Sequence, residues 1–190
     1  MKRSNFIKLI LLLFIGIGIV SCKKDKQEDS LSLIERHGLS GTFTAQITPT
    51  FMGTNPITSD EHSVYFEDAG NGRLRMHYEK FRASPMPFEM SVDIIMTVKA
   101  GPDNTVLFEG GGGTFKAEPP NGEEIDPNDI PEGIQLPEES LGGLSSDKAT
   151  ITGTYAEVEK EGQKAWRYDL KLTPGIPLPI EVVIYSKHKN

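Results

Sequence analysis

The chain has 190 residues, a formal net charge of −7 and a single cysteine. Its length suits one domain, and the acidic balance argues against nucleic acid as a partner, because nucleic acids are bound by clustered lysine and arginine. One cysteine excludes an internal disulfide, so a packed core must stabilise the fold. No motif indicates a cofactor, and we expect none.

The N-terminus has the parts of a secretory signal. Lys2, Arg3 and Lys8 supply positive charge, and Leu9–Val20 is a continuous apolar run of twelve residues. This run is too short to cross a bilayer as a helix, which takes roughly 20 residues, but it fits the apolar region of a signal peptide. We therefore exclude residues 1–21 from the fold, which leaves 169 residues with a formal charge of −10.

The only cysteine, Cys22, follows this signal directly. Ile19, Val20 and Ser21 precede it, and the arrangement resembles the lipobox of bacterial lipoproteins. The resemblance implies that the Cys22 thiol carries a diacylglycerol and that the new amine is acylated. Each buried methylene contributes about 0.8 kcal/mol, so two or three acyl chains attach a protein to a membrane almost permanently. The alternative is a secreted protein in which this cysteine occurs by chance.

Residues 22–40 are expected to form the lipid anchor and a flexible tether. The segment "KKDKQEDS" after Cys22 is polar and lacks a periodic apolar face, as is typical of a linker. Within the tether, Leu31–Arg36 is compatible with one weak helical turn. The folded domain is expected over residues 41–190.

From Gly41 onward, apolar residues alternate with polar ones, which predicts half-buried β-strands joined by short turns. Asn71-Gly72 marks a hairpin, and the longest alternation runs from Phe88 to Val98. We expect about eight strands and almost no helix. The expected strand segments are "GTFTAQIT", "HSVYFED", "RLRMHYEKF", residues 88–98, "TVLFEG", "GGGTFKA", "KATITGTYAEVE", "AWRYDLKL" and "LPIEVVIYS".

This pattern predicts an all-β fold. Closure into a barrel would remove exposed strand edges, and an eight-stranded barrel has room for side chains or one small ligand. We therefore expect an antiparallel barrel of about eight strands, with a β-sandwich as the alternative. Residues 117–147 contain nine acids, five prolines and no lysine or arginine. They predict a long acidic loop at one end of the sheet.

The segments "SGTFTAQI", "MGT", "VYFEDAGNGRLRMHYEKF" and Phe88–Val98 together resemble the calycin-like, or lipocalin-like, β-barrel domain of lipid-anchored proteins in Gram-negative bacteria. The resemblance departs from true lipocalins at Gly41-Thr42-Phe43, where those proteins have Gly-x-Trp, so no lipocalin ligand or receptor site is carried over. It implies an outer-membrane lipoprotein of the cell envelope, on the periplasmic or the cell-surface side.

No motif predicts catalysis, so the chain is expected not to be an enzyme, with an enzyme of unknown class as the alternative. His62 and His77 are expected on facing strands of one hairpin. A third ligand with the spacing of a metal site is missing, so both are interpreted as surface histidines. Gly110–Gly113 lacks the Gly-Lys-Ser/Thr of a phosphate loop and predicts a turn or a β-bulge.

Two groups of residues remain as candidate sites. In the acidic loop, Asp126, Asn128 and Asp129 offer the hard oxygen ligands that Ca²⁺ prefers, although we expect a solvated loop without metal. On the strands, methionine and aromatic side chains share the inward face, where they either fill the core or line a pocket for an apolar ligand. The candidate pocket residues are Phe88, Met90, Ile94, Met96, Trp166 and Tyr168.

The sequence therefore predicts a non-catalytic β-barrel protein attached to a membrane through Cys22. Its expected partner is a small apolar or amphipathic ligand or an envelope protein, and not nucleic acid. The alternative is a structural or accessory subunit of an outer-membrane complex without a small-molecule ligand, in which residues 117–147 are the docking element.

Overall fold

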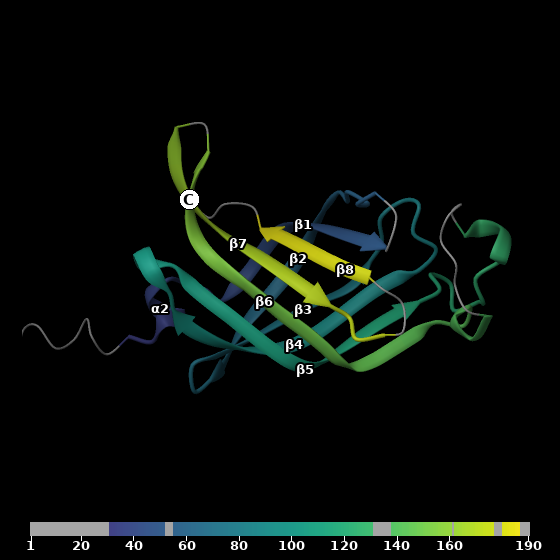
Figure 1. The fold of residues 1–190 in the computed structure, drawn as a ribbon, viewed down its shortest axis with the longest axis horizontal. Coiled ribbons are helices and arrows are strands. Elements are labelled where there is room, and N and C mark those ends of the chain that lie inside the picture. The colour runs from purple at the N-terminus through teal and green to yellow at the C-terminus, as the bar shows by residue number, and fades with distance from the viewer. Residues whose placement is uncertain (1–30, 52–54, 131–137, 161, 177–179, 187–190) are drawn as a thin grey trace, which may run out of the picture. The chain divides into compact units, whose positions relative to one another are not determined.

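A computed structural model gives the fold, and it describes residues 31–51, 55–130, 138–160, 162–176 and 180–186 (Figure 1). Eight antiparallel strands form one closed barrel, in which each strand pairs with the next and β1 pairs with β8. The strands are β1 (Gly41–Phe51), β2 (Glu61–Gly70), β3 (Arg73–Phe81), β4 (Glu89–Ala100), β5 (Val106–Glu118), β6 (Leu144–Lys160), β7 (Gln163–Thr173) and β8 (Ile180–Ser186). The short helical elements are α2 (Leu33–Arg36), η2 (Pro102–Asn104), η3 (Pro127–Asp129) and η4 (Glu138–Ser140). The all-β, eight-stranded antiparallel barrel is confirmed, and the alternative sandwich is wrong.

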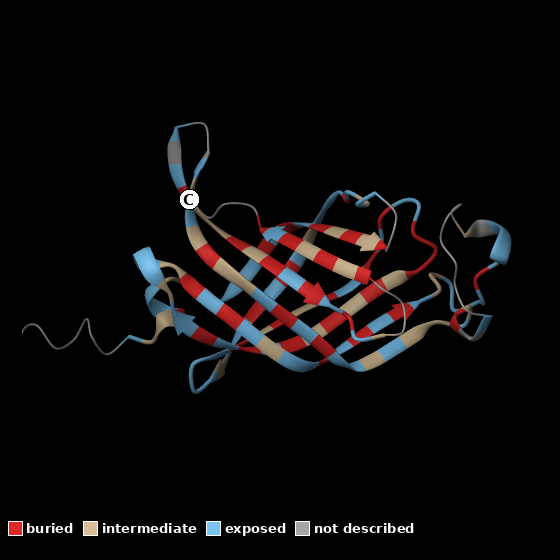
Figure 2. Cartoon of the chain, viewed as in Figure 1, coloured by how far each residue is buried: buried red, intermediate tan, exposed pale blue. Residues whose placement is uncertain are grey.

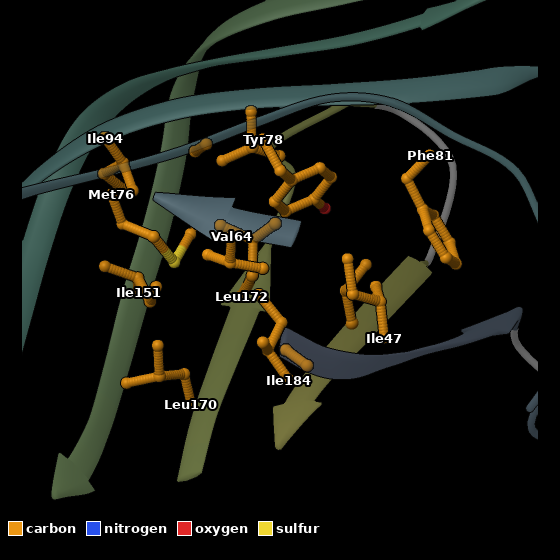
Figure 3. Close-up of a cluster of buried hydrophobic side chains, with 14 of the residues drawn as sticks. Ile47, Val64, Met76, Tyr78, Phe81, Ile94, Ile151, Leu170, Leu172 and Ile184 are labelled. Carbon is orange, nitrogen blue, oxygen red and sulfur yellow. The ribbon is translucent and has the colours of Figure 1, made fainter. Parts of the chain in front are cut away.

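Buried and exposed residues alternate along the strands (Figure 2), which is the pattern of a sheet that closes around one core. In β4, Met90, Ile94 and Met96 are buried between exposed or half-buried neighbours. Among the described residues, the buried apolar side chains other than that of Ala165 belong to a single cluster. Figure 3 shows its middle, where side chains from opposite sides of the barrel, such as Met76 and Leu170, point toward a common centre.

The glycine run Gly110–Gly113 lies inside β5 and forms β-bulges. The two strand segments expected on its sides are one 13-residue strand, with register shifts toward both neighbouring strands. Gly112 has a φ of +72°, and a Cβ on Gly113 would lie 2.6 Å from the Ile94 side chain. Only glycine adopts a positive φ at position 112 and leaves room for Ile94 at position 113 without strain. The glycine run therefore allows the strand to bend around the barrel.

The two ends of the barrel differ. We call the end where β1 begins the helix end, because α2 precedes β1 there, and the opposite end, which carries the acidic loop, the loop end. Ser32 and Glu35 form a capping box at the start of α2, which stabilises this short helix. Ile34 and Leu39 are buried in the core cluster. The segment from α2 to Leu39, which was expected to belong to the tether, therefore contributes buried side chains to the core.

The acidic loop is shorter than the expected span of residues 117–147. β5 continues to Glu118, and β6 already begins at Leu144, because the ladder between the two strands extends to these positions. Within the loop, the Ile125 N–H donates a 2.9 Å hydrogen bond to the Leu141 carbonyl, and Ile125 is buried. The described parts of the loop are thus packed against one another.

Candidate functional site

The six candidate pocket residues lie on or next to the inner face of the barrel but do not gather in one place. Phe88 contacts Phe51 at the loop end, with ring centroids 6.0 Å apart. Tyr168 is buried at the helix end, and Trp166 is half-buried there. The residues expected to line the pocket from β4 and its approach, which are Phe88, Met90, Ile94 and Met96, are at most 2% exposed. The interior position of these side chains is as expected, and their role as ligand contacts stays a prediction.

Aromatic side chains fill the helix end of the barrel. The Tyr168 ring stacks on Phe66 with centroids 4.1 Å apart, and it makes edge or tilted contacts with Phe43 and Phe108. Its hydroxyl donates a 2.6 Å hydrogen bond to the Leu39 carbonyl, and burial raises the pKa of this hydroxyl. These contacts close the helix end with packed and hydrogen-bonded groups.

The loop half of the interior holds a buried phenol, that of Tyr78. Tyr78 is 0% exposed, and its hydroxyl has no hydrogen bond to any described residue. Figure 3 shows the ring among Val64, Leu172 and Ile47, with its oxygen directed toward the side of Phe81. Burial raises the pKa of the hydroxyl, which stays protonated. An unpaired buried polar group costs about 1–3 kcal/mol, so this hydroxyl calls for an explanation.

A β-bulge in β3 brings Tyr78 and Phe81 into the interior together. The register of β3 against β4 shifts between these two residues, and Lys80 between them has a φ of +52°. His62 of β2 packs on both rings, with centroids 6.2 Å from Tyr78 and 5.6 Å from Phe81. Its Nε2 lies 3.1 Å from the Glu79 carbonyl oxygen. The loop end of the interior is therefore largely apolar, and its described polar groups include the Tyr78 phenol and the His62 imidazole.

Alternation in the sequence does not predict this group of Tyr78, Phe81 and His62. Strict alternation places Tyr78 inside but turns Phe81 outward, and it gives His62 a polar surrounding. The available signal was the spacing "YEKF", in which two aromatic residues lie three positions apart in a strand instead of two, as a bulge requires.

The two histidines weighed as metal ligands are far from a common site. His62 is half-buried beside the interior aromatic rings, whereas His77 stacks on Tyr65 on the outer face, with centroids 5.1 Å apart. Among the described residues, no three His, Cys, Asp or Glu side chains lie close enough to hold a metal ion.

A cleft of about 710 Å³ lies at the loop end, between the segment that joins β3 to β4 and the acidic loop. The Arg82 Nε donates a 3.1 Å hydrogen bond to the Met86 carbonyl and so braces this joining segment. The volume is in the range of small-molecule sites. The described lining residues are Arg82, Ser84, Pro85, Met86, Pro87, Pro119, Pro120, Asn121, Glu123, Glu124, Ile125 and Asp126.

On the outer face, Arg75 of β3 ties neighbouring strands together. Its guanidinium makes two hydrogen bonds to Asp93 of β4, at 2.8 and 2.6 Å, and one to Glu67 of β2, at 3.0 Å. The hydrogen bonds from Arg75 lower the pKa of Asp93. Because these charges satisfy one another across three strands, we interpret the network as structural.

The calcium candidates lie at a capped turn. Asp126 Oδ1 accepts hydrogen bonds from the backbone N–H and the side-chain amide of Asn128, at 2.8 and 2.7 Å. This carboxylate therefore already caps η3. The Asp129 side chain lies outside the described part of the chain, and so does Cys22, whose lipidation stays a prediction.

The chain matches no protein-family model, no curated protein and no solved structure. Its closed, eight-stranded antiparallel meander is consistent with a calycin-like architecture. In the part of the chain that the structure describes, each helix is too short or too polar to span a membrane. The site must therefore be interpreted from its own geometry.

Proposed function

We propose that this protein is a non-catalytic, lipid-anchored β-barrel of the calycin-like kind in the bacterial cell envelope, and that it binds a small amphipathic ligand inside the barrel. The observation that carries the proposal is the buried hydroxyl of Tyr78, which has no hydrogen-bond partner among the described residues and lies in an apolar interior. A ligand atom that hydrogen-bonds this hydroxyl would remove a cost of about 1–3 kcal/mol. The apolar part of the ligand would contact the surrounding side chains.

The loop end is the route by which a ligand would enter. The helix end is filled by the aromatic contacts of Tyr168. At the loop end, His62 is half-buried and lies next to Phe81, so a polar ring stands between solvent and the apolar interior. Met90 and the neighbouring Phe88 can adapt to an irregular ligand, because methionine in particular repacks at low cost.

Native mass spectrometry of the protein purified from its own membrane tests the ligand. We expect a small molecule on the wild type and an affinity about two- to tenfold lower on Tyr78→Phe, seen as lower occupancy, since one hydrogen bond is worth a factor of about 2–10. Tyr65→Phe changes an exposed tyrosine of the outer face and should keep the wild-type occupancy. Absence of a small molecule from wild-type protein, or equal occupancy in Tyr78→Phe, would reject the proposal.

A protein partner is the second candidate, and the observation that favours it is the exposure of large apolar side chains on the outer face. These are Tyr65, Ile95, Leu107 and Tyr185. They lie on four different strands, which is weaker support than one contiguous patch would be. A protein subunit in the same mass spectrum would favour an accessory role in an outer-membrane complex.

Labelling with radioactive palmitate tests the anchor separately. We expect label on the wild type and none on Cys22→Ala, because the thiol is the proposed attachment point. An unlabelled wild type would remove the membrane anchor and leave ligand binding untouched.

A further inference from the structure

A second cleft, of about 280 Å³, lies at the helix end of the barrel. The residues that line it come from three separate segments: α2 and its C-cap, the connection between β4 and β5, and the paired strands β6 and β7. They are Arg36, His37, Asn104, Tyr155 and Trp166. The cleft is at the opposite end of the barrel from Tyr78, so it does not depend on the proposed ligand of the interior.

Aromatic rings form one wall of this cleft. Tyr155 and Trp166 are stacked, with centroids 5.4 Å apart and planes 22° apart. The His37 ring packs on Trp166 at 5.5 Å with a tilt of 57°. Tyr155 is anchored from behind by Tyr168, at 4.8 Å. Trp166 is half-buried, so it presents part of a fixed indole to solvent, and a fixed aromatic ring is an amphipathic contact surface.

Polar groups form the rim. The Asn104 amide both donates and accepts hydrogen bonds, and its backbone has a φ of +62° in the connection after β4. Burial and the neighbouring Arg36 lower the pKa of His37, so at neutral pH its imidazole has one donor and one acceptor nitrogen. Of the described residues that line the cleft, none is acidic. The rim therefore suits hydroxyl groups, which both donate and accept hydrogen bonds.

We propose that this cleft binds one pyranose ring of a carbohydrate. A pyranose has an apolar C–H face, which matches the solvent-facing part of the Trp166 indole, and the buried Tyr155 ring supports that indole from the barrel side. Its edge carries hydroxyls that donate and accept, which matches His37 and Asn104. The volume is at the low end for small-molecule sites, so the cleft fits a single sugar ring and not a long acyl chain. An acyl chain would also leave the polar groups of the rim without hydrogen bonds.

The sole tryptophan of the chain reports on the cleft directly, because Trp166 lines it. We would titrate the full-length protein with glucose, galactose, N-acetylglucosamine and glucuronate and follow tryptophan emission. The expected result is a saturable change for at least one of these sugars, with a Kd on the order of 1 mM, as is typical of a ligand with about a dozen non-hydrogen atoms.

Two variants remove rim groups while keeping the local structure. Asn104→Gly deletes the amide in a backbone conformation that glycine adopts freely, and His37→Phe keeps a ring against Trp166 but removes both nitrogens. Each should weaken binding about fivefold. Asn71→Gly is the matched control, because Asn71 also has a positive φ, of 56°, in the turn between β2 and β3 and does not line the cleft.

The proposal would be overturned if no sugar gave a saturable change while acrylamide still quenched Trp166, since the aromatic wall would then serve only to close the barrel. Equal affinity in Asn104→Gly and the wild type would overturn it as well, even if His37→Phe failed to fold. Tyr78→Phe should bind sugar as the wild type does, so loss of the interior ligand and loss of sugar binding are separate results.

Discussion

The Tyr168 hydroxyl donates a 2.6 Å hydrogen bond to the carbonyl oxygen of Leu39, a residue that lies 129 positions earlier in the chain. Both residues are completely buried. The phenol thereby satisfies a main-chain acceptor that water cannot reach. It also fastens the segment after α2 to β7, so the N-terminal segment is part of the core and not an attachment to it.

Replacement of Tyr168 by phenylalanine tests this fastening. Tyr168→Phe keeps the ring that stacks on Phe66 but leaves the Leu39 carbonyl buried without a donor. We expect the free energy of unfolding in urea to fall by about 1–3 kcal/mol. Tyr65→Phe, on the exposed outer face, should change it by less than about 0.5 kcal/mol. Equal losses in the two variants would contradict the role of the hydrogen bond.

Alkaline pH should unfold the barrel through its buried tyrosines. Burial raises the pKa of Tyr78 and Tyr168 above the ordinary value of 10.0. Because the pKa is higher in the folded state, the unfolded chain loses its phenol protons first. The contribution of each tyrosine to the free energy of unfolding is therefore fully present below pH 10 and is lost as the pH rises above 10. Each group should then lower the free energy of unfolding by about 1.4 kcal/mol per pH unit.

Urea unfolding at a series of pH values measures this slope, and phenolate absorbance reports when the tyrosines ionise. Tyr168→Phe should have a shallower decline above pH 10, because one of the two groups is removed. Ionisation of all tyrosines in protein that remains folded would contradict the prediction.

Alternation of apolar and polar residues was enough to predict the barrel and most of its interior. Met90, Ile94 and Met96 are inside because every second side chain of a strand points to the same face of the sheet. The bulge at Lys80 was not predictable in this way, since a positive φ at lysine follows from the ladder around it and not from its own propensity. The joining of two strand segments at Gly110–Gly113 likewise depends on both neighbouring strands.

The candidate sites were harder to predict than the fold. The cleft at the helix end combines residues from α2, a turn and two strands, so only the closed barrel brings His37, Asn104 and Trp166 together. Similarly, the lack of a hydrogen-bond partner for the Tyr78 hydroxyl among the described residues follows from what surrounds it in three dimensions. The spacing of residues in a sequence does not indicate whether a buried polar group has a hydrogen-bond partner.

Gly113→Ala tests the bend in β5. A Cβ at this position would lie 2.6 Å from the Ile94 side chain, so the interior must shift, at a cost of about 1–3 kcal/mol. Gly111→Ala is a control within the same run, since its nearest neighbour would be the Thr150 methyl at 3.8 Å. Thermal or urea unfolding should separate the two variants, and equal stability would show that the glycine run does not act through close packing.

Acid pH tests the outer network of Arg75, Asp93 and Glu67. Hydrogen bonds from Arg75 lower the pKa of Asp93 below its ordinary value of 3.8. A lowered pKa in the folded state means that the stabilisation is fully present above pH 3.8 and is lost as the pH falls from there. Asp93→Asn should therefore lower the urea midpoint at pH 7 and converge with the wild type as the pH falls below 3.8. Asp60→Asn, an exposed site outside the network, should have little effect at either pH. If the urea midpoints of Asp93→Asn and the wild type differed by the same amount across this pH range, the carboxylate charge would not stabilise the network of Arg75, Asp93 and Glu67.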